Sequence, residues 1–214
     1  MTAELLAEGD ARTAAAPIIA SSSSGMLPST LAAMARWHPE RVVVGHLFNP
    51  VYLIALVEVA GAPDTPPDTV ARALAFYVAI GKRPIHVRRE VPGHLANRLQ
   101  AALWREAYSL VERGAATVAG VDAAIAHGPG LRWALLGPFV NQHLSGGDGG
   151  LGPPTQKWMD DLGTPQLTPA LAQLLVDGVD EQLRGVDVVA MTTRRDALLV
   201  DLLAAKSASA DLPP

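Results

Sequence analysis

Two side chains that are capable of acid–base chemistry stand in one apolar part of the sequence. His46 follows the run "VVVG", and Glu58 stands inside the apolar run from Leu53 to Ala60. A carboxylate is costly to bury unless it is paired, so Glu58 needs a partner. A carboxylate that accepts from one imidazole nitrogen fixes the tautomer and leaves the other nitrogen as a general base near neutral pH. The alternative is a Glu58 that points to solvent or pairs with an arginine.

Ser24 follows another short apolar run, "PIIASS", much as His46 follows its own. Ligands of open α/β sheets bind outside the carboxyl ends of the strands. We therefore expect Ser24 and His46 to face one crevice. The alternatives are a turn or cap serine at position 24 and a structural histidine at position 46.

Predicted strands alternate with predicted helices over residues 1–90, the part of the chain that must position these side chains. Short apolar runs predict strands at 17–22, 41–48, 53–61 and 83–88. Helical patterns cover residues 4–14, 27–37 and 65–82. In the last of these helices, Thr65 is the expected N-cap and Gly81 the expected stop. Strands that alternate with helices predict a parallel, doubly wound sheet.

After about residue 91 the sequence predicts helices and no strands. A long helix is expected over 93–116, with further helices over 117–128, 167–183 and 193–206. The apolar positions of the long helix have the spacing of a core-facing stripe. They are Leu95, Leu99, Ala102, Leu103, Ala107 and Leu110. We therefore predict an α/β part at 1–90, a helical domain at 91–204 and a disordered tail at 205–214.

The composition excludes several classes of protein. Hydrophobic residues make up 49% and charged residues 18% of the chain, which is enough to bury a core. The net charge is −4, so the chain lacks the positive electrostatic potential that is typical of a nucleic-acid-binding protein. The absence of cysteine excludes disulfides, zinc–thiolate sites and thiol catalysis, and we expect no metal. No apolar run is long enough to span a bilayer and the N-terminus lacks a basic signal region, so we expect a cytoplasmic protein.

A glycine-rich segment, "SGGDGGLGPP", contains G-x-G-x-x-G at Gly147, Gly149 and Gly152. That pattern binds a dinucleotide only where it follows a strand and opens a helix. Here it lies within the helical part, with no strand before it. A loop is the better interpretation.

Several motifs together resemble the NAD-dependent 3-hydroxyacyl-CoA dehydrogenase family. They are "IIASSSSG", "VVVGHLFNP", "LVEV", "VPGHLANRLQAALWREAYSLVERG" and "DAAIAHGPGLRWALLGPF". They occur in the family's order from about residue 3 to about residue 140, and more loosely to residue 204. "GLRWALLGPF" and "HVRREV…NRLQ" resemble the branch that acts on free hydroxy acids, such as L-gulonate and L-carnitine dehydrogenases. The resemblance implies NAD as cofactor, a small hydroxy acid or acyl-CoA as substrate, and a homodimer formed through the helical domain.

The resemblance also implies roles for individual residues. His46 matches the base that takes the hydroxyl proton as hydride leaves for the nicotinamide, and Glu58 matches its carboxylate partner. Ser24 matches the serine that bonds the substrate oxygen near the nicotinamide, and Asn97 matches the asparagine that completes the site. Arg132, in "GLRW", is expected to bind a substrate carboxylate. The alternatives are a surface amide for Asn97 and a solvent-facing arginine for Arg132.

The sequence departs from the family pattern in two ways. His94 stands where the family usually has an aromatic or aliphatic residue. This imidazole near Asn97 is either a site residue or a local substitution, and we favour the substitution. The strand, glycine turn and helix that open the family's cofactor domain do not occur here. We therefore expect a truncated Rossmann-type sheet that keeps only the last strands, weak NAD binding, and a fragment or one piece of a split dehydrogenase. The alternative is a non-catalytic helical dimerisation module, but the intact set of His46, Glu58, Ser24 and Asn97 favours the dehydrogenase.

Overall fold

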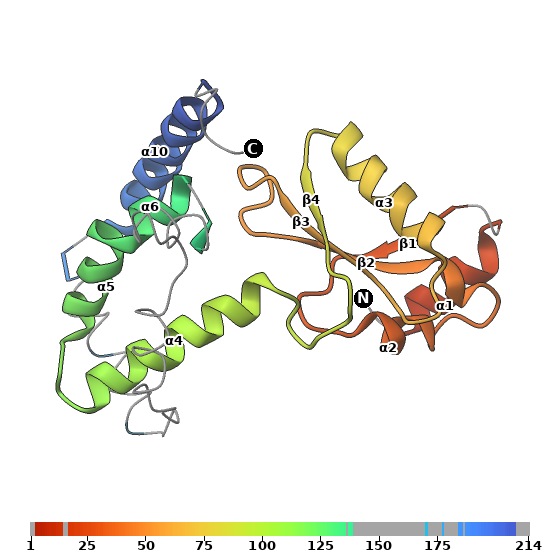
Figure 1. Ribbon diagram of the computed structural model, residues 1–214, viewed down its shortest axis with the longest axis horizontal. Helices are drawn as coiled ribbons and strands as arrows, with labels where there is room; N and C mark the ends of the chain where they lie inside the picture. The colour runs from red at the N-terminus through yellow and green to blue at the C-terminus, as the bar shows by residue number, and fades with distance from the viewer. Residues whose placement is uncertain are drawn as a thin grey trace, which may run out of the picture. The chain divides into compact units, whose positions relative to one another are not determined.

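The computed structural model describes residues 3–14, 17–135, 137–138, 170, 177, 184–185 and 187–208 (Figure 1). Helices and strands are interspersed up to residue 86, and helices alone follow in the described residues. The first elements are α1 (Ala3–Arg12), β1 (Ile19–Ser21), α2 (Pro28–Ala32), the 3-10 helix η1 (Pro39–Arg41) and β2 (Val42–Leu47). They are followed by β3 (Leu56–Gly61), α3 (Pro67–Ala79) and β4 (Arg83–His86).

The sheet is mixed, with its strands in the order β1-β2-β3-β4. Strand β1 runs parallel to β2, and β3 runs parallel to β4. Strands β2 and β3 are antiparallel, so the predicted all-parallel sheet is wrong at this pair. The physical reason is the connection over residues 48–55, which contains no helix. A parallel return needs a crossover of a dozen or more residues, which this segment cannot supply.

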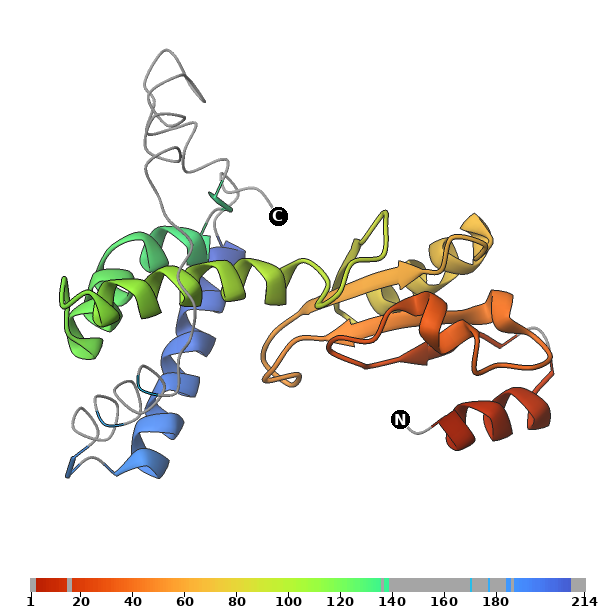
Figure 2. The same cartoon turned by 90° about the horizontal axis from the view of Figure 1, so that it is seen from below.

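The two faces of the sheet are covered by different helices. Alternate residues of β2 separate onto the two faces: Val42 and Val44 pack in one core cluster and Val43 packs in the other. The first cluster includes Leu6 of α1 and Leu31 of α2, and the second includes residues of α3. Figure 2 shows α3 on one side of the sheet and α1 on the other. Each fully buried valine contributes about 1.5–3 kcal/mol, so β2 stabilises the sheet through both of its faces.

Helix α3 ends as the sequence predicts but begins differently. Gly81 follows its last turn with a φ of 78°, a left-handed conformation that glycine adopts without strain. At the other end the N-cap is Pro66, so the prediction of Thr65 as N-cap is wrong. The Thr65 hydroxyl accepts from the Ala62 amide at 2.9 Å instead, and closes the turn after β3.

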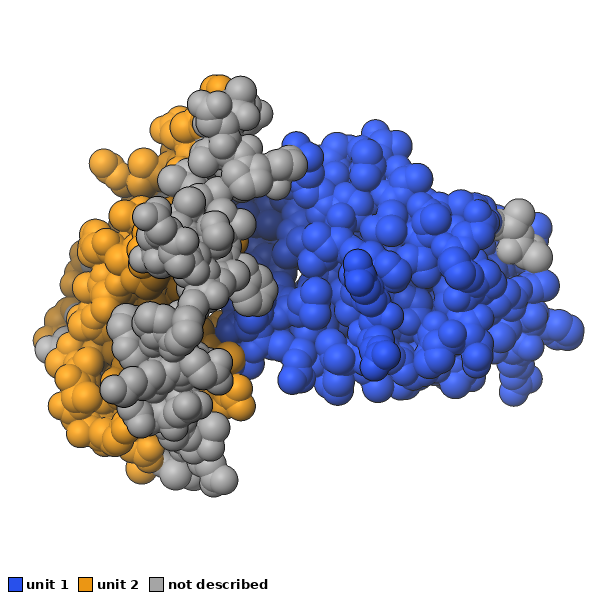
Figure 3. All heavy atoms as spheres, viewed as in Figure 1, with its two compact units in different colours: residues 1–101 blue, residues 102–214 orange. Residues whose placement is uncertain are grey.

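The chain divides into two compact units, residues 1–101 and 102–214 (Figure 3). Helix α4 (Ala96–Glu112) continues through this division. Described helices of the second unit are α5 (Val118–His127), α6 (Pro129–Leu135) and α10 (Val188–Ala208), and no helix among the described residues could cross a membrane. Helix α10 extends into the segment 205–214 that the sequence predicts to be disordered. The glycine-rich segment 145–154, and the predicted helix 167–183 apart from residues 170 and 177, lie outside the described residues.

The apolar stripe of α4 does not face a core along its first half. Leu95 is 41% exposed and Leu99 is 65% exposed. Ala102 is also exposed, whereas Leu103 and Leu110 are half-buried. The predicted core-facing stripe is therefore wrong for its N-terminal positions. Periodicity identifies an apolar face but does not reveal whether the same chain covers it.

Candidate active site

His46 and Glu58 lie directly opposite each other on β2 and β3. Nδ1 of His46 donates to Oε2 of Glu58 at 2.8 Å. His46 is 4% exposed and Glu58 is fully buried. The antiparallel register produces this contact, because directly opposed residues project to the same face of a sheet. The structure thus brings together the two residues that the sequence singles out first.

The second oxygen of Glu58 binds the N-terminus of α4. Oε1 accepts from the amides of Leu95 and Ala96 at 2.8 and 2.9 Å. The first amides of a helix have no intrahelical acceptor, and the helix dipole favours a negative charge beside them. Together with the imidazole, these donors compensate the cost of burying a carboxylate. Sequence reasoning missed both amides, although the Pro92–Gly93 pair before "ANRL" marks a helix start where such donors occur.

The pairing with Glu58 decides which nitrogen of His46 is available for chemistry. Because Nδ1 carries the proton that is donated to the carboxylate, neutral His46 has its lone pair on Nε2. That atom can accept a proton from a substrate hydroxyl group. The carboxylate then stabilises the positive charge that the ring acquires. The arrangement is suited to general-base catalysis.

Ser24 and Asn97 are joined through the backbone. Nδ2 of Asn97 donates to the Ser24 carbonyl oxygen at 2.9 Å. Ser24 is exposed and follows β1, whose carboxyl end lies at the same sheet edge as that of the parallel strand β2. The contact therefore connects α4 to the loop after β1 without using the serine hydroxyl. The roles of that hydroxyl and of Asn97 toward a substrate stay predictions.

His94 lies beside the pair rather than on a peripheral surface. Its side chain is fully buried, and its ring centroid is 5.2 Å from that of His46, with the planes tilted by 39°. Nε2 of His94 donates to the Ser23 carbonyl oxygen at 3.1 Å. Nδ1 is buried and has no hydrogen-bond partner. The sequence predicts a local substitution at this histidine, and the structure places its ring against that of the candidate base.

Arg132, the predicted substrate ligand, is an exposed residue of α6 in the second unit. Its role toward a carboxylate stays a prediction.

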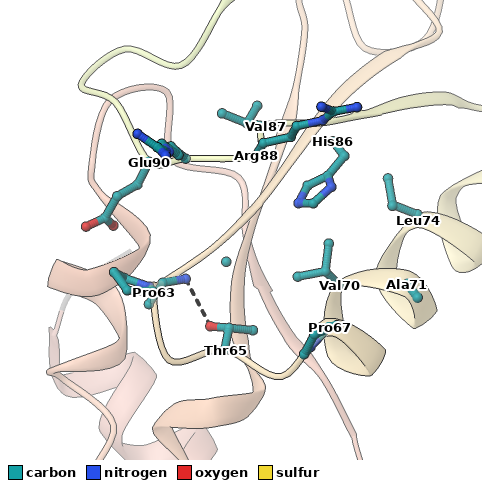
Figure 4. A pocket seen from close by; sticks show the side chains of 13 residues that line it. Pro63, Thr65, Pro67, Val70, Ala71, Leu74, His86, Val87, Arg88 and Glu90 are labelled. Atoms are coloured by element: carbon teal, nitrogen blue, oxygen red, sulfur yellow. Dashed lines mark hydrogen bonds between the residues drawn. The ribbon is translucent and has the colours of Figure 1, made fainter.

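A separate hollow of about 700 Å³ lies between α3 and the ends of β3 and β4. Figure 4 shows His86 above Val70, with Glu90 extending from the other side of the hollow. Because β3 runs antiparallel to β2, this hollow is at the sheet edge opposite to His46. Glu90 is already an acceptor for the Ser29 amide at 2.8 Å. The hollow is thus distinct from the histidine–glutamate site.

Two family models together match most of the chain. The NAD binding domain of 3-hydroxyacyl-CoA dehydrogenase matches residues 2–91, and the C-terminal domain of the same enzyme matches residues 93–186. The chain belongs to the 3-hydroxyacyl-CoA dehydrogenase family. The predicted family and the predicted cofactor of the family, NAD, are thereby confirmed. The Rossmann-like first part with a small mixed sheet and the helical second part fit these two domains.

Similar curated proteins are L-carnitine dehydrogenases. The one from Bacillus cereus is 46% identical over 206 residues, which cover 93% of this chain and 63% of the relative. The one from Streptomyces griseus is 46% identical over 209 residues, with 94% and 62% covered. The chain therefore spans about three fifths of the length of these relatives.

Solved structures of dehydrogenases have the same fold. A 5-formyl-3-hydroxy-2-methylpyridine 4-carboxylic acid 5-dehydrogenase, described as an NAD⁺-dependent dismutase, superposes with a TM-score of 0.77 at 25% identity. The match covers 97% of this chain and 71% of that one. The (S)-3-hydroxybutyryl-CoA dehydrogenase of Ralstonia eutropha has a TM-score of 0.55 at 27% identity, with 67% and 49% covered.

The described residues of this family member fit one end of NAD. Exposed Ser24 and buried His46 share the carboxyl edge of β1 and β2, the edge at which open α/β sheets bind their ligands. Within the described part of the chain, no glycine-rich turn joins a strand to a helix to hold a pyrophosphate. The residues present are therefore suited to the reacting end of the cofactor rather than to its phosphates.

Proposed function

We propose that this chain takes part in the NAD-dependent oxidation of a 3-hydroxyacyl-CoA or a free 3-hydroxy acid to the 3-oxo product. The observation that carries the proposal is the buried hydrogen bond from Nδ1 of His46 to Glu58. It leaves Nε2 as a base at the sheet edge where dinucleotide folds bind their ligands. Membership of the dehydrogenase family supports the same reaction class.

Each of the four site residues has its own role in this reaction. Nε2 of His46 takes the hydroxyl proton while the adjacent carbon loses hydride, and a carbonyl group forms. Bound NAD supplies the acceptor for that hydride. Glu58 stabilises the imidazolium through Oε2, while its other oxygen is held by the α4 amides. Ser24 and Asn97 complete the site by binding the substrate oxygen and fixing the serine loop.

We further propose that the substrate is a free hydroxy acid. The 45–46% identity to proteins named L-carnitine dehydrogenase supports this choice over an acyl-CoA. Arg132 would then hold the substrate carboxylate through a bidentate pair. Arg132→Ala should raise KM for the free acid about tenfold or more, and should affect its CoA thioester much less. Equal effects on both substrates would remove Arg132 from this role.

A homodimer is the assembly that we propose for the chain. Leu95, directly before α4, and Leu99 and Ala102 of α4 form an exposed apolar face at helical spacing. A second copy of the same helix is a suitable cover for it. The cytoplasmic location and the domain limits at residues 90 and 204 also stay predictions.

Steady-state kinetics of the purified 214-residue chain test the reaction. NADH absorbance is followed with L-carnitine and with a 3-hydroxyacyl-CoA, for the wild type and for His46→Gln. We expect turnover in the wild type and a loss of about a hundredfold or more in the variant, with unchanged circular dichroism. Turnover retained in His46→Gln would exclude the base role. A folded wild type that neither turns over nor binds NAD by calorimetry would favour the alternative, a non-catalytic helical dimerisation module.

A further inference from the structure

Two side chains, one in the turn before α4 and one in its first turn, bind the loop after β1. Nε2 of His94 holds the carbonyl oxygen of Ser23 at 3.1 Å, and Asn97 holds that of Ser24 at 2.9 Å. The neighbouring amides of Leu95 and Ala96 hold Glu58. One short segment therefore fixes both the serine loop and the carboxylate that orients His46.

The hydrogen bond of His94 determines its tautomer. A carbonyl oxygen accepts only, so Nε2 must carry the proton that reaches Ser23. Nδ1 then carries a lone pair and no proton. This agrees with its position, because it is buried without a hydrogen-bond partner. With no proton on Nδ1, the His94 ring has no second donor that could bind the lone pair on Nε2 of His46. That lone pair therefore stays available to accept a substrate proton.

The backbone at His94 is held in an unusual conformation. Its φ of 55° is the only positive value at a non-glycine residue in the described part of the chain. Such a conformation is uncommon for a residue with a side chain, although histidine adopts it more often than most. Strained positions persist where the surrounding contacts determine them, and here those contacts are the Ser23 carbonyl and the His46 ring.

We propose that His94 is a positioning residue for the base His46. Its donor fixes the serine loop, and its ring forms a buried wall 5.2 Å from the His46 centroid, so that the base keeps its alignment with Glu58. This proposal rests on the base role of His46 stated under the proposed function. It assigns a purpose to a residue that departs from the family pattern.

Two amide substitutions separate the hydrogen bond from the bulk of the ring. In His94→Gln, the amide nitrogen reaches the place of Nε2 and keeps a donor for Ser23. His94→Asn tolerates the positive φ better, but is too short to reach that carbonyl. His86→Asn is the matched control, because His86 is an exposed histidine on β4. All variants are made in the full chain.

The spectroscopic readout is the proton on Nδ1 of His46 in protein labelled with ¹⁵N-histidine. Its resonance is identified by its disappearance in His46→Gln. We expect His94→Asn to speed exchange of this proton with water about tenfold or more and to lower kcat by a similar factor with little change in KM. His94→Gln should stay within about twofold of the wild type on both measures, as should His86→Asn.

Unchanged proton exchange in a folded His94→Asn would overturn the proposal. Equal losses in His94→Gln and His94→Asn would overturn the route through the Ser23 carbonyl. The resonance is observed without substrate or NAD. A wild type without turnover would therefore contradict the proposed function, while the comparison of the His46 proton would still decide the role of His94.

Discussion

Glu58 is bound on both oxygens, and this makes it more than a simple ion-pair partner. One oxygen accepts from the imidazole of His46, and the other accepts from the first amides of α4. Removing the negative charge therefore affects both the tautomer of His46 and the anchoring of α4. The two effects are separable, because an amide oxygen still accepts from backbone donors while an amide nitrogen does not accept from Nδ1.

Glu58→Gln should reduce catalysis far more than it reduces stability. Its oxygen can keep the bonds to Leu95 and Ala96, but its NH₂ group would face the Nδ1 proton of His46. The ring then favours the wrong tautomer, and we expect kcat to fall by about 10³–10⁴-fold, as when a triad carboxylate becomes an amide. Steady-state kinetics and thermal melts measure the two effects. The control is Glu40→Gln, in the exposed His38–Glu40 pair with a 3.0 Å contact, which should change neither. A kcat within tenfold of the wild type would contradict the proposed role.

Helix α3 packs closely on β2, the strand that carries His46. A Cβ added at Gly45 would lie 2.8 Å from Cζ of Tyr77 and closer still to its hydroxyl oxygen. Both neighbours of Gly45 in the chain, Val44 and His46, are buried, so β2 has little freedom to move. The approach of the Tyr77 ring, rather than a turn, therefore favours glycine at position 45.

Gly45→Ala should destabilise the fold by about 1–3 kcal/mol, the usual cost of overpacking a core. Urea unfolding measures the change. Gly9→Ala is the matched control, because a Cβ there meets nothing within 4 Å. On the helix α1 that substitution should be neutral or stabilising. A Gly45→Ala variant as stable as Gly9→Ala would show that the Tyr77 ring moves away without cost.

Helix α1 is attached to η1, directly before β2, by a buried ion pair between Asp10 and Arg41. Asp10 accepts from the Trp37 amide at 2.7 Å and from Arg41 at 2.9 Å. Burial alone raises the pKa of Asp10, but the hydrogen bonds from Trp37, Arg41 and His38 and the charge of Arg41 outweigh it. They hold the pKa below the ordinary value of 3.8. Folding therefore favours the ionised carboxylate.

The sign of the pH dependence follows from that lowered pKa. The stability contributed by Asp10 is fully present above its unfolded pKa of 3.8 and is lost as the pH falls through the lower folded value. Asp10→Asn leaves Arg41 buried without a counterion and should cost about 3–5 kcal/mol at neutral pH. It should also flatten the dependence of stability below about pH 4. Urea unfolding across that range tests both effects, with exposed Asp64→Asn as control. An unchanged acid slope in Asp10→Asn would refute the assignment.

The sequence predicted the elements better than their directions and partners. Strands and helices over residues 17–88 follow from apolar runs and periodicity, and Gly81 ends α3 as expected. The antiparallel turn between β2 and β3 was missed, because alternation along a strand carries no information on its direction. The His46–Glu58 contact was foreseen from residue types alone. The α4 amides were not, since backbone donors have no residue signature.

At the scale of the whole molecule, α4 presents an apolar face that the described residues leave open. Leu95, Leu99 and Ala102 lie at positions i, i+4 and i+7, and Leu99 is 65% exposed. At about 25 cal/mol per Å², covering such a stripe is favourable. An isologous contact places the same face of two copies together, which is the commonest oligomer symmetry. These features support the proposed homodimer.

Leu99→Glu should convert that dimer into a monomer. Two carboxylates would meet at the twofold contact, and each would lose water without gaining a partner, so we expect the dimer to weaken by about a hundredfold or more. Sedimentation equilibrium should give twice the 22.4 kDa of one chain for the wild type and a single-chain mass for the variant. Val78→Glu is the control, because Val78 is a comparably exposed apolar residue, 61% exposed, on helix α3. If Val78→Glu dissociates the protein and Leu99→Glu does not, the contact lies on α3. A wild type that sediments as a monomer at every concentration would mean that the α4 stripe serves another partner.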